Sequence, residues 1–179
     1  RVTRRSPTPR TRADFHAAQG VLVVVRDPPP PPPPARGQPP MVPGDPAEGV
    51  EVLLAVWDDG SVTALNGHVD LGTGIRTALA QIAADELDVA IEAVTMVLGD
   101  TARAPNQGPT IASASIQIHA VPLRLAAAQA RAWLVERATA ALCTTTIGIC
   151  EEALRLTAEY TKTREQFDRP IATFQAVGQ

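Results

Sequence analysis

Two closely spaced glycines follow a β-prone segment and lead directly into a helical pattern, an arrangement suited to binding an anion. The stretch runs from Gly67 to Ile75 and contains Gly72, Thr73 and Gly74 between the two elements. The first amides of a helix have no partner within the helix, so they face whatever lies beyond the strand. Glycines of an ordinary tight turn produce the same spacing. The pattern therefore predicts either an anion site or a structural turn.

The histidines and cysteines indicate little further site chemistry. His16, His68 and His119 are dispersed along the chain, so the sequence predicts no metal site made by the protein itself. Cys143 and Cys150 lie on one predicted helix, which separates their Cα atoms by about 10.5 Å. A disulfide requires a separation below about 7 Å, so we expect two reduced thiols. No nucleophile, histidine and acid form a catalytic set.

The composition fits a soluble protein of one domain or two small pieces. The 179 residues are 45% hydrophobic, and the net charge of −3 is unevenly distributed. Residues 1–36 contain seven arginines and two acidic residues. This basic end has no interleaved aromatic residues, so we expect a tail and no nucleic-acid partner. No apolar run approaches the ~18 residues of a membrane helix, which predicts no membrane span.

Residues 10–25 have a basic start followed by a short apolar run, which is the shape of an export signal. Ala13 stands where a second arginine would be expected, and Arg26 and Asp27 end the apolar run early. We therefore interpret residues 1–27 as a degenerate twin-arginine-like leader and expect a cytoplasmic protein rather than an exported one. The alternative is an edge strand.

A proline-rich segment separates this end from the rest of the chain. Residues 28–34 are seven consecutive prolines, and thirteen of the 17 prolines precede residue 47. Proline fixes φ and lacks an amide donor, so residues 28–46 are predicted to form an extended linker. We expect residues 1 to about 46 to be mobile. A ligand for a proline-reading partner is the alternative.

Beyond the linker, the pattern predicts an α+β fold in which helices pack on a small sheet. Residues 50–57 and 61–66 are β-prone and flank a turn at Gly60, which indicates a hairpin. Apolar residues at helical spacing follow from Ile75, and residues 95–99 resemble a short buried strand. A second helix is expected at residues 123–136, and a longer one before a stop at Arg169 and Pro170, with a new helix near Thr173.

A dense set of matches connects the first half of the chain to a known family. Residues 67–82, 97–101 and 105–115 resemble the molybdopterin-binding large subunit of the xanthine dehydrogenase and aldehyde oxidase family, of the isoquinoline oxidoreductase and nicotinate dehydrogenase type. The resemblance covers about residues 50–137, and we place the corresponding partial domain at residues 47–137. It implies oxidation of aromatic heterocycles or aldehydes at molybdenum held by molybdopterin dinucleotide, with oxygen taken from water. An iron–sulfur small subunit is the implied partner.

The same resemblance assigns candidate cofactor-binding residues. It implies that Gly72, Thr73 and Gly74 face the molybdopterin, with Thr73 in the position of a glutamine that faces the metal in a variant of the family's motif. Residues 100–110 and the small residues 112–115 would approach the pterin closely. Without the resemblance, residues 112–115 are a helix start capped by serines.

From residue 138 a different pattern begins. Residues 151–171, with the motif Tyr-x-Lys-Thr-Arg-x-Gln-Phe-x-Arg-Pro-Ile, are similar to the C-terminal four-helix domain of acyl-CoA dehydrogenases. We place this partial helical domain at residues 138–179. The resemblance implies an FAD site that needs a neighbouring subunit, and hence a homo-oligomer. The implied FAD-contacting residues are Arg164, Gln166, Phe167 and Gln175, and Asp168 departs from the family's usual glycine. Alternatively, Arg164 interacts only with the dipole at the end of its helix.

Both resemblances place the catalytic glutamate outside the matching segments, so we assign no catalytic residue. We expect an oxidoreductase fragment of the molybdopterin-dependent hydroxylase type that is incomplete and inactive alone. The alternatives are an FAD-binding helical module like that of acyl-CoA dehydrogenases and a non-enzymatic truncated or rearranged fusion.

Overall fold

The computed structural model describes residues 8–26, 51–111 and 113–174. The chain divides into two compact units, the first extending to Trp133 and the second beginning at Leu134. The first unit contains a four-stranded sheet with helices, and the second is mainly helical. The fold is therefore α+β, which confirms the predicted class.

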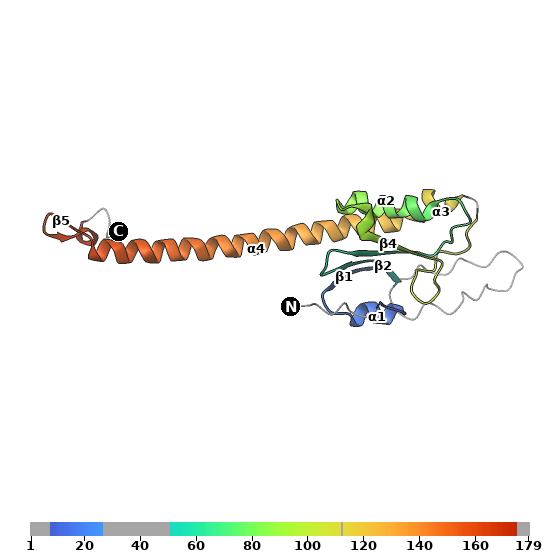
Figure 1. Ribbon diagram of the computed structural model, residues 1–179, viewed down its shortest axis with the longest axis horizontal. Helices are drawn as coiled ribbons and strands as arrows, with labels where there is room; N and C mark the ends of the chain where they lie inside the picture. Colours follow the sequence, from blue (N-terminus) through green and yellow to red (C-terminus); the bar gives the residue numbers. More distant parts are fainter. Residues whose placement is uncertain (1–7, 27–50, 112, 175–179) are drawn as a thin grey trace, which may run out of the picture. The chain divides into compact units, whose positions relative to one another are not determined.

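The sheet of the first unit is mixed and has the strand order β1-β2-β3-β4 (Figure 1). Its strands are β1 (Val21–Arg26), β2 (Glu51–Trp57), β3 (Val62–Asn66) and β4 (Val94–Leu98). The β1-β2 and β2-β3 pairs are antiparallel, whereas β3 and β4 are parallel. Helix α2 (Ile75–Leu87) lies between β3 and β4 in the sequence because a parallel pair needs a crossover connection. The carboxyl ends of β3 and β4 consequently lie at the same edge of the sheet.

The hairpin between β2 and β3 confirms the predicted turn. The amide of Trp57 donates to the carbonyl oxygen of Ser61 at 2.9 Å. Gly60 has a φ of 82°, a conformation that glycine adopts without strain. The expected strands at residues 50–57 and 61–66 therefore form as a pair.

Helices cover both faces of this sheet (Figure 1). On one face, α2 and the first turns of α4 (Ala120–Thr163) pack on the strands, and α1 (Arg12–Ala17) packs on the other. Of the helical positions expected to be apolar in α2, Ile75, Leu79, Ala83 and Leu87 are buried and Ile82 is partly buried. The larger core is built mainly from aliphatic side chains and alanines, including Leu53, Leu54, Ala64, Ile75, Leu79, Ala83, Leu123, Ala127 and Ala130.

Residues 8–26, which were expected to belong to a mobile, leader-like tail, contain a helix and a strand of the first unit, and their origin as a leader stays a prediction. Thr11 and Asp14 form a capping box at the start of α1, and Phe15 is only 1% exposed. Strand β1 pairs with β2, with Val23 opposite Ala55, so the edge-strand alternative holds. Val24 of β1 is 2% exposed and packs in a core built from residues distant in sequence, which local pattern cannot reveal. The predicted linker at residues 28–46 lies outside the described residues.

Helix α4 continues from the first unit into the second and includes the expected helix at residues 123–136. Pro122 lies in its first turn, where the missing amide donor costs nothing. The cysteines at 143 and 150 are exposed free thiols on this helix, as expected. In the parts of the chain that the structure describes, no helix is both long enough and apolar enough to cross a membrane.

A small hairpin follows the long helix in the second unit. Helix α4 ends at Thr163 and is followed by β5 (Glu165–Gln166) and β6 (Arg169–Pro170), which pair antiparallel. Phe167 and Asp168 form the turn with φ values of 54° and 58°. Helix α4 therefore ends six residues before the predicted stop at Arg169. The 3-10 turn η2 (Ile171–Thr173) follows the hairpin, and most of the new helix expected from near Thr173 lies outside the described residues.

Candidate functional site

The loops that follow β3 and β4 meet at the carboxyl edge of the parallel pair, and glycines allow their close approach. A Cβ atom added to Gly67 would lie 2.2 Å from the carbonyl oxygen of Pro105. A Cβ atom on Gly99 would lie 2.3 Å from Cγ1 of Val69, and Gly99 also has a positive φ of 61°. Real Cβ atoms essentially never show such contacts, so a side chain at residue 67 would collide with the backbone of Pro105. One at residue 99 would displace the side chain of Val69 and would be strained by the positive φ.

A buried carboxylate anchors the loop after β4 to the sheet. Glu51, at the start of β2, is 0% exposed, and its Oε2 lies 2.9 Å from Nη2 of Arg26 at the end of β1. Its other oxygen accepts the backbone N–H of Asn106 at 2.8 Å. Because both oxygens have a donor, the carboxylate can be buried and still hold strand and loop together.

Two amide side chains fasten the same region to the start of α4. Asn66, which is fully buried, donates to the carbonyl oxygen of His119 at 2.9 Å. Gln107 donates to the same oxygen at 3.1 Å and accepts the backbone N–H of Gly67 at 2.8 Å. One hydrogen-bonded network thus connects the end of β3, the loop after β4 and the residue that precedes α4.

Residues 67–74, which precede α2 and are called the glycine loop below, are organised by Asp70. Its Oδ1 accepts the backbone N–H groups of Gly72, Thr73 and Gly74 at 3.0, 2.9 and 3.2 Å. Its Oδ2 accepts the N–H of Arg76 at 3.2 Å. These hydrogen bonds, above all that from Arg76, lower the pKa of the Asp70 carboxyl below its usual range. The amides expected to face an external anion are therefore occupied by a carboxylate of the chain itself.

We expect Asp70→Asn to reduce stability at neutral pH and to flatten its acid dependence. A carboxyl whose pKa is lowered on folding stabilises the protein above the unfolded-state pKa, and that contribution disappears as the pH falls through the lowered value. Thermal unfolding measured between pH 7 and about pH 3 should show a smaller loss of stability for the variant than for the wild type. Asp85→Asn, on the exposed side of α2, is the control and should follow the wild-type curve. Parallel curves for the wild type and Asp70→Asn would contradict the assignment.

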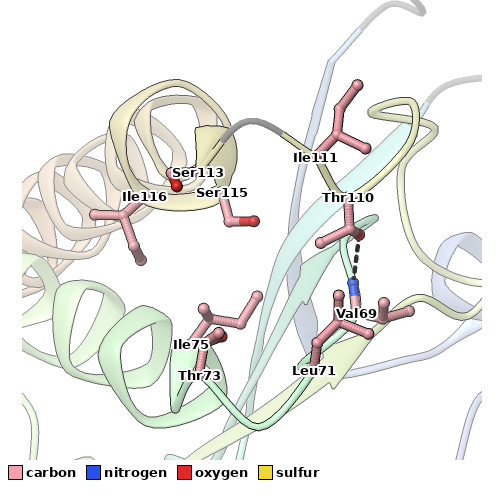
Figure 2. Close-up of a pocket in the computed structure, with 9 residues that line it drawn as sticks. All are labelled: Val69, Leu71, Thr73, Ile75, Thr110, Ile111, Ser113, Ser115 and Ile116. Atoms are coloured by element: carbon pink, nitrogen blue, oxygen red, sulfur yellow. Dashed lines mark hydrogen bonds between the residues drawn. The ribbon is translucent and has the colours of Figure 1, made fainter.

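An open pocket of about 350 Å³ lies between the glycine loop and the segment that follows residue 109 (Figure 2). The backbone N–H of Val69 donates to Oγ1 of Thr110 at 3.0 Å and joins the two segments at one side. Ser113 and Ser115, at the start of α3 (Ala114–Gln117), lie on the opposite side. The lining combines aliphatic side chains with four hydroxyl groups and comprises Val69, Leu71, Thr73, Ile75, Thr110, Ile111, Ser113, Ser115 and Ile116.

Of the predicted cofactor-binding residues, Thr73 lines this pocket, and the two glycines beside it are open. Gly72 and Gly74 have φ values of 87° and 75°, and a Cβ atom added to either would meet nothing within 4 Å. A helix start capped by serines was expected near residues 112–115. Ser113 is indeed the N-cap residue of α3, but its side chain makes no capping hydrogen bond to the helix. Residue 112 lies outside the described residues. The structure thus brings side chains from residues 69–75, 110–111 and 113–116 to one pocket.

Two histidines that are dispersed in the sequence are neighbours in the structure. The ring centroids of His68 and His119 are 4.2 Å apart, and Nδ1 of the fully buried His68 lies 2.7 Å from Oγ of Ser115. Burial, and then the neighbouring His68 and Arg26, lower the pKa of His119. Within the described residues, no three side chains of His, Cys, Asp or Glu are grouped so as to hold a metal ion.

The residues predicted to contact FAD lie in the second unit, around its hairpin. The amide of Arg164 donates to the carbonyl oxygen of Tyr160 at 2.8 Å, just beyond the end of α4. Gln166 pairs with Arg169 in the hairpin, and Phe167 is 88% exposed in the turn. Gln175 lies outside the described residues. Their role in binding FAD stays a prediction.

Sequence reasoning missed the residues that shape the pocket: Asp70, Asn66, Gln107 and the pair formed by His68 and Ser115. Asp70 had a local signal, because an aspartate two residues before a glycine is a frequent start of a side-chain-capped turn. The contacts of Asn66 and Gln107 with His119, and of His68 with Ser115, had no local signal, since these partners lie 12 to 53 positions apart in the chain.

The pocket lies at the carboxyl edge of a parallel strand pair, which is where ligands commonly bind in open sheets of this kind. Residues 34–176 match the molybdopterin cofactor-binding domain family. The match covers most of the chain, which therefore belongs to this family. The predicted relationship to molybdopterin-binding hydroxylases is confirmed.

Individual relatives are much longer than this chain. A nicotinate dehydrogenase subunit of Pseudomonas putida is 55% identical over 129 residues, which are 72% of this chain and 11% of that protein. Xanthine dehydrogenase 1 of Arabidopsis thaliana is 36% identical over 67 residues, or 37% of this chain and 5% of the relative. Acyl-CoA dehydrogenase FadE27 of Mycobacterium tuberculosis is 53% identical over 47 residues, or 26% of this chain and 13% of the relative. No solved structure matches the chain.

Proposed function

We propose that this chain forms one wall of a molybdopterin dinucleotide site in a molybdenum-dependent hydroxylase that oxidises an aromatic heterocycle or an aldehyde. The observation that carries the proposal is the pocket between residues 69–75 and 110–116, which lies at the glycine loop in a chain of the molybdopterin-binding family. The 55% identity to a nicotinate dehydrogenase subunit supports a heterocycle as the class of substrate.

The pocket fits the uncharged part of such a cofactor better than its phosphates. None of its nine lining residues carries a charge, and the nearby amides of residues 72–74 already donate to Asp70. Aliphatic side chains and hydroxyls suit a flat, polar ring system such as a pterin. Thr73 and the open backbone at Gly72 and Gly74 would contact that ring. When bound, the molybdenum centre supplies oxidation of a carbon–hydrogen bond with oxygen taken from water.

Other segments would have to complete the active site. The chain spans 11% of the nicotinate dehydrogenase subunit that it resembles, and the resemblance places the catalytic glutamate elsewhere. A positioned general acid or base contributes about 10²–10⁴-fold to a rate. We therefore propose that these 179 residues bind the cofactor weakly and catalyse no turnover alone. A partner subunit, of the iron–sulfur kind or a second copy, and a cytoplasmic location are part of the proposal.

The proposal is tested by titrating the purified chain with molybdopterin dinucleotide under anaerobic conditions and following backbone NMR signals. We expect signals of residues 69–75 and 110–116 to shift. Thr73→Glu should weaken binding by about tenfold or more, because it places a charge in a site that lacks a counter-ion. Thr139→Glu on the exposed face of α4 is the matched control and should bind like the wild type. Shifts confined to other residues, or none at saturating cofactor, would reject the site.

The second candidate function is an FAD-binding helical module formed by residues 138–179. The match to an acyl-CoA dehydrogenase over 47 residues favours it, and so does the exposure of Phe167. A guanidinium such as that of Arg164 can donate to two phosphate oxygens at once. A parallel titration with FAD separates the candidates, because it should perturb residues 164–167 and require a dimer. A chain that remains monomeric and shows no shift there would leave molybdopterin as the only cofactor.

A further inference from the structure

Helix α4 carries an apolar stripe that no residue of the described part of the chain covers. Residues 134–160, all in the second unit, are exposed throughout. Every seventh residue of this stretch is a branched apolar side chain that is 52–69% exposed, namely Val135, Leu142, Ile149 and Leu156. A second set follows each of them by four residues and comprises Thr139, Thr146, Ala153 and Tyr160. Alternating spacings of four and three align the eight residues, here called the α4 stripe, as in a coiled coil.

The threonines of the α4 stripe can be buried without leaving a polar group unpaired. Oγ1 of Thr139 donates to the carbonyl oxygen of Val135 at 2.8 Å. Oγ1 of Thr146 donates to the carbonyl oxygen of Leu142 at 2.8 Å. A hydroxyl that is hydrogen-bonded within its own helix needs no partner from water or from another helix. The whole stripe is therefore suited to contact a second apolar surface.

The sizes of the side chains indicate that this surface is the α4 stripe of a second copy in antiparallel orientation. Reversing one helix makes the first set of residues face the second set. Three levels then join a large side chain to a small one: Leu142 with Ala153, Ile149 with Thr146, and Leu156 with Thr139. Tyr160, the large member of the second set, faces Val135, the smallest member of the first. Complementary sizes of this kind fill a helix interface without voids.

A parallel pair fits less well. It aligns identical residues, so that Ala153 meets Ala153 and Thr146 meets Thr146, and small side chains facing each other leave space unfilled. The antiparallel alignment described above is also unique, because it is the one that gives all eight residues a partner within the stripe. The stripe thus specifies both the orientation and the register of the pair.

The residues beside the stripe make no repulsive contact in this alignment. Glu152 and Glu159 lie at its edge and are paired with Arg155 of their own helix at 2.6 and 2.7 Å. In the antiparallel pair they approach Thr145 and Ala138 of the second copy, which carry no charge. No two carboxylates meet, so charge does not oppose the association.

We propose that residues 135–160 of α4 pair antiparallel with the same residues of a second copy of this chain. The pairing involves the second unit and no cofactor, so it goes beyond the proposed function and does not depend on it. Cys143 and Cys150, both exposed free thiols, directly follow Leu142 and Ile149 and lie at the same edge of the stripe. Antiparallel pairing brings Cys143 of one copy to Cys150 of the other. A parallel pair places the cysteines of the two copies at opposite edges.

Single-cysteine variants test this geometry with a short bis-maleimide, which joins two thiols through thioether bonds. Full chains with Cys143→Ser or Cys150→Ser are cross-linked separately and as an equimolar mixture. Within either variant alone, the second copy has its cysteine seven residues from the facing position, about 10.5 Å along the helix. We expect the mixture to give several-fold more covalent dimer than either variant alone.

Leucine variants of matched exposure test the stripe itself. Leu142 and Leu154 are both 69% exposed, but Leu154 lies outside the stripe. Leu142→Asn should raise the dissociation constant of the dimer at least about tenfold in sedimentation equilibrium, because each pair buries this side chain twice. Leu154→Asn makes the same change in helix propensity and should associate like the wild type. Thr139→Glu should dissociate the pair yet keep its affinity for molybdopterin dinucleotide, because the pocket lies in the first unit.

A chain that stays monomeric at the highest attainable concentration would overturn the inference. Equal weakening of the dimer by Leu142→Asn and Leu154→Asn would do so too. Equal cross-linking of the two cysteine variants alone and of their mixture would exclude the antiparallel alignment. Loss of cofactor binding by a chain that still forms the dimer would reject only the proposed function.

Discussion

Replacing Arg26 with methionine is expected to lower the free energy of unfolding by about 3–5 kcal/mol. The substitution leaves the carboxylate of Glu51, which is 0% exposed, with the backbone N–H of Asn106 as its remaining donor. A buried charge without its partner is strongly destabilising. Because the same carboxylate anchors the loop after β4, the NMR signals of residues 104–108 should broaden or shift as well. Denaturant unfolding followed by circular dichroism measures the free energy.

The matched control is Arg155→Met on helix α4. Arg155 also pairs with carboxylates, those of Glu152 and Glu159 at 2.6 and 2.7 Å, but its side chain is 52% exposed. Exposed ion pairs contribute about 0–1 kcal/mol, so this variant should unfold at nearly the wild-type denaturant concentration. Similar losses in the two variants would show that the burial of Glu51 does not decide the effect.

Leu79→Ala is expected to cost about 2–5 kcal/mol, the range measured for large-to-small changes in well-packed cores. Leu79 is 0% exposed and belongs to the core between α2, the sheet and the start of α4. The glycine loop continues directly into α2, so a poorly packed helix should also weaken ligand binding in the pocket. Thermal and denaturant unfolding give the stability, and the cofactor titration gives the binding.

Leu71→Ala separates the two effects. Leu71 lies eight residues earlier, lines the pocket and is 71% exposed. Its truncation should change stability by no more than about 0.5 kcal/mol but reduce the affinity for molybdopterin dinucleotide. A stability loss equal to that of Leu79→Ala would mean that the loop, and not the helix, supports the core.

Local sequence patterns predicted the elements of the first unit well where a single segment carried the signal. The hairpin at Gly60, helix α2 and the strand after it all follow from periodicity and turn chemistry within a few residues. The density of matching segments likewise sufficed to identify the molybdopterin-binding family. The end of α4 was placed too late, because the hairpin that follows Thr163 turns at Phe167 and Asp168, and sequence rules expect glycine or asparagine at such a turn.

The N-terminal segment illustrates what local pattern cannot decide. Five apolar residues after a basic start suit both an export signal and a strand. The choice depends on pairing with β2 across a separation of 25 residues, as between Arg26 and Glu51. Such a contact is favourable only after the intervening chain has been ordered, so no short window contains the information.

By itself, the sequence determined the secondary-structure elements around the glycine loop, the family and the position of that loop before a helix. The tertiary structure alone decided what the loop does. It placed Asp70 on the amides that were expected to bind an external anion, and it brought His68 to Ser115 across 47 residues. The physical reason is that the parallel strands β3 and β4 have their carboxyl ends at the same edge of the sheet. The two loops that follow these strands therefore meet there and form the pocket together. Their contact is set by the crossover connection through α2, which the residues of neither loop specify.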